Sequence, residues 1–332
     1  MAGLAAAGAL AGFGAETVLF ESEESPAGHV KDWAKLFPDR RAAPEVTGHL
    51  TEALGDAVEK RFGSPVTSVK PIGGVFEVRA QGNDPLLVHA VVMATGFDLF
   101  DASRKEEYGY GIYHNVITSA GLEEAFRSGR PLLTSSGKTP GRVALIHCVG
   151  SRDEKAGNLY CSKVCCVTAV KQAIEIREQL PECEVFSFYM DLRMFDRHFE
   201  EMYIEAQKKW GVTFIRGRLS ECAENPDHTL VIKTEDTLAG RPMRITVDLV
   251  VLMTGMVPRR STGPLAASLG LNTGSDGFLL PHDGHFAANA TTIPGVFLAG
   301  TGKGPAGIAE AIADGRSAAT AAWKYLNTLE EM

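Results

Sequence analysis

The stretch Val88-His-Ala-Val-Val-Met-Ala-Thr-Gly96 decides the fold, because its pattern returns at Val247-Asp-Leu-Val-Val-Leu-Met-Thr-Gly255. Each copy predicts a buried hydrophobic strand that ends in a Thr-Gly turn. Paired segments of this kind are typical of chains with two nucleotide-binding α/β domains, in which the glycine lets the backbone approach a cofactor. The repeat therefore predicts an α/β fold with two such domains.

The N-terminal residues supply part of the first domain. Residues 2–11 predict a helix, Gly14 stands at its expected C-cap, and residues 17–21 predict a short strand. They form the second half of a βαβ unit, in which Gly3 is the last glycine of a G-x-G-x-x-G loop. Glu21 stands where a Rossmann unit holds a ribose hydroxyl. We therefore expect a flavin domain whose first strand is missing from this chain.

The C-terminal part returns to the same domain. Residues 293–302 predict a strand that feeds a glycine turn, and a helix is expected at about 306–325. A helix that starts beside a flavin ring directs its N–H dipoles toward the ring. Residues 326–332 are expected to form a frayed tail.

Four cysteines with the spacing C-x12-C-x3-C-C predict a metal site in the middle of the chain. They are Cys148, Cys161, Cys165 and Cys166. The apolar run 143–148 predicts a buried parallel strand, and the last two cysteines open a helix that we expect from about Val167. A helix start favours thiolates through its dipole and free N–H groups.

The same region predicts a second α/β unit, inserted into the first. Its expected elements are a helix at 167–180, a strand at 184–190, a helix at 194–209, a strand at 212–215 and a hairpin-like pair at 228–233 and 243–247. The expected domains are the first part of the FAD-binding domain at 1–135, the second nucleotide-binding-like domain with the cysteines at 136–260, and the return segment at 261–332. The flavin domain is therefore expected to be discontinuous.

Bulk composition excludes several classes of protein. The net charge of -8 means that the chain has no excess of basic residues with which to bind nucleic acid. No apolar run reaches about 18 residues, so we expect no transmembrane segment. The alanine-rich start is not interpreted as a signal peptide, because no Lys or Arg precedes Lys31. Six cysteines, four of them clustered, fit a reducing compartment, so we expect a cytoplasmic chain in which Cys183 and Cys222 are buried or inert.

Four long motifs resemble the A subunits of heterodisulfide reductases and their relatives. They are Tyr108-Gly-Tyr-Gly-Ile-Tyr-His-Asn-Val-Ile-Thr-Ser119, Cys148-Val-Gly-Ser-Arg-Asp-Glu, Tyr160-Cys-Ser-Lys-Val-Cys-Cys and Met190-Asp-Leu-Arg-Met-Phe. The resemblance covers nearly the whole chain. It implies a thioredoxin-reductase-like core that binds FAD and one [4Fe-4S] cluster, with the four clustered cysteines as ligands. No catalytic side chain is expected, because the cofactors carry the chemistry.

Seven residues are expected to contact FAD. Residues 25–38 match the flavin-pyrophosphate region of the family and contribute Gly28, and the others stand in the half-motif and the glycine turns. The set is Gly3, Glu21, Gly28, Gly96, Gly300, Thr301 and Gly302. Thr301 stands where many flavoproteins place an aspartate, and its hydroxyl can still hydrogen-bond ribityl or phosphate oxygens without bringing a charge.

The position of the cysteines favours an iron-sulfur cluster over zinc. A two-dinucleotide enzyme places a second glycine fingerprint after the strand at 143–148, whereas here the loop begins Cys148-Val-Gly-Ser and supplies thiolates. Iron prefers four sulfur ligands, although a site of four thiolates suits zinc equally. Adjacent cysteines are uncommon in zinc knuckles, and a flavin in the same chain would be an electron-transfer partner for a cluster.

Three neighbours of the cysteines have open roles. Arg152 and Lys163 either stabilise a reduced cluster or are merely solvated. His147 is interpreted as a core or surface histidine rather than a ligand.

The absence of ferredoxin-like C-x2-C-x2-C runs makes the chain similar to the short form in sulfur-oxidising heterodisulfide-reductase-like complexes. That likeness implies a cytoplasmic subunit that relays electrons between FAD and the cluster. It implies partners that resemble the B and C subunits, a lipoate-binding protein that delivers sulfur, and a homodimer within a larger complex. The quinone-interacting oxidoreductase subunit of sulfate reducers shares the core and stays open as an alternative.

Two further functions stay open. A non-catalytic nucleotide-fold scaffold fits the missing strand, because the pyrophosphate then loses its N–H cradle. A misplaced start codon explains the same observation more simply, since the pattern resumes in mid-motif at Met1. A pyridine-nucleotide-disulfide reductase with a redox cysteine pair is the other, and the missing second glycine fingerprint argues against it.

Overall fold

The computed structural model describes residues 1–330 and divides the chain into two compact units. Unit 1 comprises Met1–Lys31, Pro44–Asp98 and Val257–Met332, and unit 2 comprises Asp32–Ala43 and Leu99–Met256. These units divide the chain differently from the domain ranges expected above. Residues 99–135 fall in unit 2, because the strand at Val116–Thr118 pairs within its sheet.

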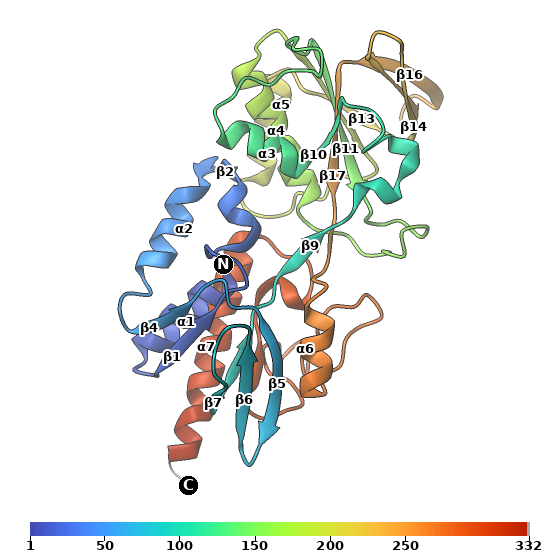
Figure 1. Ribbon diagram of the computed structural model, residues 1–332. Helices are drawn as coiled ribbons and strands as arrows, with labels where there is room; N and C mark the ends of the chain where they lie inside the picture. The colour runs from blue at the N-terminus through green and yellow to red at the C-terminus, as the bar shows by residue number, and fades with distance from the viewer. Residues whose placement is uncertain (331–332) are drawn as a thin grey trace. The chain divides into compact units, whose positions relative to one another are not determined.

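Unit 1 combines short parallel strand pairs, an antiparallel sheet and four α-helices (Figure 1). Its elements are α1 (Ala2–Gly12), β1 (Thr17–Phe20), the 3-10 helix η1 (Gly28–Asp32), α2 (Ala43–Glu52), β4 (Val58–Arg61), β5 (Val66–Ile72), β6 (Val75–Ala80), β7 (Leu86–Val88), β8 (Val91–Met93), α6 (Thr262–Leu269), β19 (Val296–Leu298), η4 (Gly300–Lys303) and α7 (Ile308–Glu330). β1 pairs in parallel with β4, and β8 pairs in parallel with β19.

Helices α1 and α7 of unit 1 pack closely because both carry small residues. Ala2 and Ala318 belong to one buried cluster. A Cβ atom added to Gly315 of α7 would lie 2.3 Å from the backbone oxygen of Ala2, so this approach requires glycine. The start of α1 is thereby held against the C-terminal helix.

Unit 2 is built around a parallel sheet. Its elements are β2 (Lys35–Leu36), β3 (Arg41–Ala42), η2 (Ala102–Arg104), η3 (Glu106–Tyr108), β10 (Val116–Thr118), α3 (Ser119–Arg127), β11 (Arg142–Val149), α4 (Cys165–Gln179), β12 (Glu184–Tyr189), α5 (Phe199–Lys208), β13 (Thr213–Arg216), β14 (Leu219–Glu224), β15 (Leu230–Asp236), β16 (Arg241–Val247) and β17 (Leu249–Thr254). Two further strands, β9 (Phe97–Leu99) and β18 (Met256–Pro258), pair with each other where the chain passes between the units.

The sheet of unit 2 has the strand order β10-β17-β11-β12-β13, and all its pairs are parallel. Figure 1 shows α3, α4 and α5 on one side of this sheet and the antiparallel sheet β14-β15-β16 on the other. A parallel sheet covered on both faces has buried strands without alternation, as in β17, where every residue is buried. The expected α/β architecture and the hairpin-like pair are therefore confirmed.

Several elements differ in length from the sequence expectations. α7 continues to Glu330, and its C-terminal half is anchored by Tyr325, whose ring lies 6.1 Å from that of Phe297. The frayed tail expected at 326–332 is therefore wrong up to residue 330, and residues 331–332 lie outside the described part. The strand expected at 88–96 is limited to β8, because β19 pairs with only three of its residues.

Two helix starts also differ. α5 begins at Phe199 rather than 194, because His198 before it has a left-handed backbone with φ +71°. α4 begins at Cys165 rather than near 167. Within residues 1–330, no helix is long and apolar enough to cross a bilayer.

A buried ion cluster ties the β2–β3 segment to helices α3 and α4. Lys171 of α4 donates hydrogen bonds to Glu123 at 2.5 Å and to the carbonyl oxygen of Lys35 at 2.8 Å. Glu123 also accepts the backbone N–H of Ala34 at 3.1 Å. Glu175 lies 3.2 Å from the same ammonium and is 3% exposed. Two buried carboxylates thus share one ammonium, and burial raises the pKa of Glu175 to about 7.

We expect Glu175→Gln to stabilise the protein at pH 8 but not at pH 5. The folded pKa lies above the ordinary value of 4.5, so the folded chain keeps a proton that the unfolded chain has released between pH 4.5 and about 7. The free energy of unfolding therefore falls as pH rises through this window. The variant should recover roughly 1–3 kcal/mol at pH 8 in chemical denaturation. Glu178→Gln on the same helix is the control and should give no such pH-dependent gain; an equal effect of Glu175→Gln at both pH values would contradict the assignment.

Candidate functional site

The four clustered cysteines lie on three consecutive pieces of unit 2. Cys148 is near the end of β11 and has a left-handed backbone with φ +58°. Cys165 and Cys166 are the first two residues of α4, and the sulfur of Cys165 lies 3.8 Å from that of Cys148. Cys161 lies in the intervening loop, where its sulfur accepts the backbone N–H of Lys163 at 3.3 Å. All four are free thiols.

Hydrogen bonds between the thiols shift their pKa values. The pKa of Cys165 is raised well above its usual range, because its proton is shared with Cys148 and Cys166 and the group is buried. The pKa of Cys148 is lowered because it accepts a hydrogen bond from Cys165, and Arg152 adds a favourable charge. The pKa of Cys166 is lowered to about 4 by Cys165 and, more weakly, by hydrogen bonding with His147. The pKa shifts of Cys148 and Cys166 are therefore both in the direction of the thiolate form.

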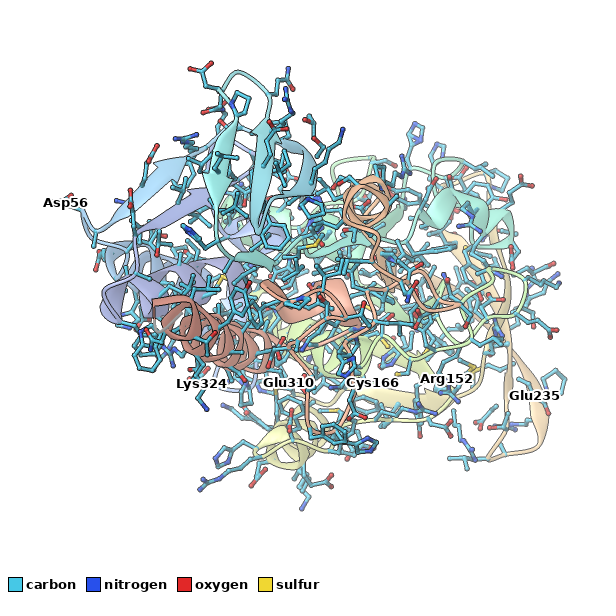
Figure 2. The ribbon with its side chains drawn as sticks, turned by 90° about the horizontal axis from the view of Figure 1, so that it is seen from below. Asp56, Arg152, Cys166, Glu235, Glu310 and Lys324 are labelled. Carbon is cyan, nitrogen blue, oxygen red and sulfur yellow. The ribbon has the colours of Figure 1, made fainter. Side chains whose placement is uncertain are left out.

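Asp191 is a site residue that the sequence reasoning did not single out. Its carbonyl oxygen lies 3.5 Å from the sulfur of Cys166, and its carboxylate accepts a hydrogen bond from Arg152 at 2.7 Å. Figure 2 labels Cys166 and Arg152. Arg216 makes a second ion pair with the carboxylate at 3.2 Å. Arg152 is therefore a paired, partly buried cation rather than a merely solvated one, and the signal for Asp191 was the motif that begins at Met190.

A buried serine pair pins the loop that follows Cys148. The hydroxyls of Ser151 and Ser162 lie 2.5 Å apart, and Ser162 also accepts the backbone N–H of Met256 at 2.9 Å. A Cβ atom on Gly255 would lie 2.1 Å from the Ser151 hydroxyl oxygen and 2.8 Å from that of Ser162. In this structure the glycine of the Met-Thr-Gly turn makes room for serine side chains, whereas we expected it to admit a cofactor.

Asp153 anchors the same loop from the other side. It is 2% exposed, accepts a hydrogen bond from Arg218 at 2.6 Å and forms an ion pair with Lys105 at 2.9 Å. Its second oxygen accepts the backbone N–H of Lys155 at 3.0 Å. The cations come from segments far away in the sequence, so the spacing of residues gave no signal for this anchor.

The two remaining cysteines lie apart from the cluster. Burial raises the pKa of Cys183 to about 11 and that of Cys222 to about 12. Both are buried, as expected from the sequence. Among residues 1–330, no group of three or more His, Cys, Asp or Glu side chains is placed to hold a single metal ion.

In unit 1, the start of α1 lies beside two of the expected glycine positions. A Cβ atom on Gly3 would lie 3.4 Å from the Cβ of Ala94, in the turn after β8. Gly300 has φ +68°, and a Cβ there would lie 2.5 Å from the Cβ of Ala2. The structure thus brings Gly3 and Gly300 to the same helix end, where a bound phosphate would meet free N–H groups.

The two glycine turns also contact each other. A Cβ on Gly302 would lie 3.0 Å from the hydroxyl oxygen of Thr95. Gly96 follows with φ +78°, and no described atom lies within 4 Å of its Cβ position. Thr301 lies in η4, and its carbonyl oxygen accepts the N–H of Gly304 at 3.3 Å. These turns stay predicted FAD contacts.

Glu21 and Gly28 are the remaining predicted FAD contacts, and both belong to unit 1. Glu21 directly follows β1, and its carboxylate accepts the backbone N–H of Glu23 at 3.1 Å. Burial lowers the pKa of the Met1 amine, and the charge of Glu21 opposes that shift. Gly28 opens η1 with φ +55°, next to Ala27, which packs in one cluster with α1.

Asp314 of α7 organises the Gly300 turn and was not predicted. It accepts hydrogen bonds from the Gly300 N–H at 2.6 Å, from Lys303 at 2.7 Å and from Asn289 at 2.8 Å. The turn itself carries Thr301 where an aspartate is usual, and the acid that holds the turn comes from the following helix. An acidic residue in an alanine-rich helix was the available signal.

The fold matches thioredoxin reductases. The crystal structure of Lactococcus lactis thioredoxin reductase in its FR conformation matches with a TM-score of 0.70 and 19% sequence identity. The match covers 98% of this chain and 96% of that chain. The expected thioredoxin-reductase-like fold is confirmed.

Sequence comparisons point to a more specific group. Residues 167–315 match the family model of pyridine nucleotide-disulphide oxidoreductases. The A subunit of the H2:CoB-CoM heterodisulfide, ferredoxin reductase of Methanothermobacter marburgensis is 44% identical over 240 residues, which are 71% of this chain and 36% of the relative. The iron-sulfur A subunit of the CoB-CoM heterodisulfide reductase of Methanocaldococcus jannaschii is 43% identical over 242 residues, 71% of this chain and 37% of the relative. The chain thus matches little more than a third of the length of these curated relatives.

We expect Gly255→Ala to destabilise the protein by roughly 1–3 kcal/mol, because its new methyl group meets the buried serine pair. Thermal or chemical unfolding measures the change. Gly121→Ala in α3 is the control: the nearest atom to its Cβ would be the Thr118 hydroxyl oxygen at 3.7 Å, an ordinary contact. Adding Ser151→Ala to Gly255→Ala should recover part of the loss; equal effects of Gly255→Ala and Gly121→Ala would contradict the packing account.

Proposed function

Because the chain belongs to the family of heterodisulfide reductase A subunits, we propose that it is an oxidoreductase subunit that relays electrons between FAD and one [4Fe-4S] cluster. The observation that carries the proposal is the meeting of Cys148 with the first turn of α4, where two sulfurs lie 3.8 Å apart. In the fold class this loop holds a nucleotide pyrophosphate. Here it holds free thiols instead.

The donor set fits a cluster. Each iron of a [4Fe-4S] cluster takes one cysteine thiolate, and the four proposed ligands are Cys148, Cys161, Cys165 and Cys166. Three of them are buried, which suits an insulated redox site. The backbone N–H of Lys163 and the cation Arg152 favour negative charge on the sulfurs. The Methanocaldococcus jannaschii relative, which is named as an iron-sulfur protein, supports the same group.

The flavin half of the proposal rests on unit 1. FAD is supported by the family model and by the thioredoxin reductase fold. The proposed contacts are Gly3, Glu21, Gly28, Gly96, Gly300, Thr301 and Gly302. When bound, FAD supplies two-electron chemistry and the cluster one-electron chemistry. The chain's own residues then position and insulate the two groups, and Asp314 fixes the turn at Gly300.

The proposal also covers the cellular location of the chain, its complex and its partners. We place the chain in the cytoplasm, in a heterodisulfide-reductase-like complex of sulfur oxidation, with partners that resemble the B and C subunits and with a lipoate-binding protein as the source of sulfur. A homodimer within that complex completes the proposal. It is supported by the relatives' membership of heterodisulfide reductases and by the clustering of thiols, which suits a reducing compartment.

We expect anaerobically purified protein to contain about four iron and four sulfide per chain. Cys165→Ala should lose the iron and keep the flavin's visible bands, because the FAD residues lie in unit 1. Cys183→Ala removes a buried thiol outside the cluster and should keep both groups. One tight zinc per chain with little iron would refute the cluster. Loss of flavin together with iron in Cys165→Ala would show a structural role of the cysteines instead.

We expect Gly300→Ala to lower the FAD content of the purified protein. The added methyl group would lie 2.5 Å from the Cβ of Ala2, in a backbone conformation that alanine rarely adopts. Absorbance of released FAD per chain measures the effect. Gly12→Ala, at the end of α1, is the control, because no described atom lies within 4 Å of its Cβ position. Full FAD content in Gly300→Ala would remove this turn from the proposed flavin site.

A further inference from the structure

Arg259 joins two segments of unit 1 that carry predicted FAD contacts. It lies in the short link between β18 and α6, and its side chain is 25% exposed. One terminal nitrogen, Nη2, donates a hydrogen bond at 3.0 Å to the hydroxyl of Ser22, the residue after Glu21. The other, Nη1, lies 3.5 Å from the carbonyl oxygen of Thr95, the residue before Gly96. One guanidinium therefore contacts both the loop after β1 and the glycine turn after β8.

The Ser22 hydroxyl connects Arg259 to the carboxylate of Glu21. A hydroxyl that accepts a hydrogen bond keeps its own hydrogen for another acceptor. Ser22 donates to Oε1 of Glu21 at 3.0 Å, and the backbone N–H of Glu23 donates to the same oxygen at 3.1 Å. No hydrogen bond from the described residues reaches the second oxygen, Oε2. The carboxylate is thus oriented through one oxygen, and the other can accept a donor from a ligand.

Thr262, the first residue of α6, also holds Thr95. Its hydroxyl donates to the Thr95 hydroxyl at 2.8 Å, and its backbone N–H donates to the carbonyl oxygen of Arg259 at 2.9 Å. Thr262 is 2% exposed, so this anchor is buried. The backbone of Arg259 is therefore fixed at the start of α6, and its side chain can hold Ser22 at a set distance from the turn.

A direct contact with an FAD phosphate is the alternative role for this cation. Both terminal nitrogens of the guanidinium already have protein partners, and the carboxylate of Glu23 lies 3.7 Å from Nη2. The contacts of Arg259 therefore favour holding two chain segments together over holding a phosphate.

We propose that Arg259 is a positioning residue of the FAD site, which holds Ser22 so that the second oxygen of Glu21 accepts a hydroxyl of the adenosine ribose. The inference rests on the FAD assignment above. In nucleotide-binding units of this kind, an acid at this place contacts the ribose 2′-hydroxyl. Without the guanidinium, Ser22 is free to rotate and Glu21 loses its orientation. The affinity for FAD should then no longer depend on that hydroxyl.

The test compares FAD with an analogue that lacks the 2′-hydroxyl of the adenosine ribose. Isothermal titration calorimetry on the full chain, purified anaerobically and freed of flavin, gives the ratio of the two dissociation constants. The wild type should bind FAD about ten- to a hundredfold more tightly, as expected for a hydrogen bond to a charged group. Arg259→Ala and Ser22→Ala should each remove most of this preference. Arg260→Ala is the matched control and should keep it, because this exposed neighbour contacts Asp98 through its backbone N–H.

The outcomes separate this inference from the proposed function. A wild-type chain that binds no FAD overturns the flavin assignment and this inference together. A wild-type chain that binds FAD without preference for the ribose hydroxyl overturns this inference and leaves the flavin in place. The full wild-type preference in Arg259→Ala or in Ser22→Ala does the same, as does an equal loss in Arg260→Ala. If Arg259→Ala does not fold, Ser22→Ala decides: a lost preference supports the role, and a retained one overturns it.

Discussion

The parallel pairing of β11 between β17 and β12 fixes where the cysteines meet. A parallel strand is followed by a helix that packs back on the same sheet, so the end of the strand lies beside the start of the helix. Cys148 and the first turn of α4 are therefore neighbours by topology. The loop between them is long, and the serine pair and Asp153 hold it from two sides. The position of Cys161, which lies in this loop, therefore depends on these anchors rather than on the sheet.

The local patterns of the sequence predicted the two nucleotide-binding domains, the cysteine set and the glycine turns, because each is a short run with its own physical signature. Long-range partners could not be predicted in this way. Asp153 finds its cations at Lys105 and Arg218, and Asp191 reaches Cys166 only through the folded sheet. The assignment of residues 99–135 to unit 2 could not be predicted for the same reason, because it follows from the pairing of β10 with β17. The end of α7 and the start of α5 were also predicted wrongly. The packing of Tyr325 extends α7, and the left-handed backbone of His198 delays the start of α5.

Charge balance sets the character of unit 2. Burying a thiolate without compensation is costly, and here donors and cations gather around the sulfurs. The N–H of Lys163, the guanidinium of Arg152 and the ring of His147 all favour negative charge there. Farther along α4 the balance is opposite, since Glu123 and Glu175 share the single ammonium of Lys171. The start of α4 thus lies in a region suited to anions, whereas its middle, together with Glu123 of α3, forms a region with excess buried acid.

The β2–β3 segment has a consequence for how this molecule can be dissected. The chain changes unit at 31/32, 43/44, 98/99 and 256/257, which makes four crossings. Unit 2 is therefore made of two separate stretches and unit 1 of three, so no contiguous gene fragment encodes one whole unit without part of the other. A protease cut at any one crossing does not separate the units, because at least one of the two fragments still carries pieces of both. Fragment expression and domain shuffling across this chain consequently require circular permutation or grafted linkers instead of simple truncation.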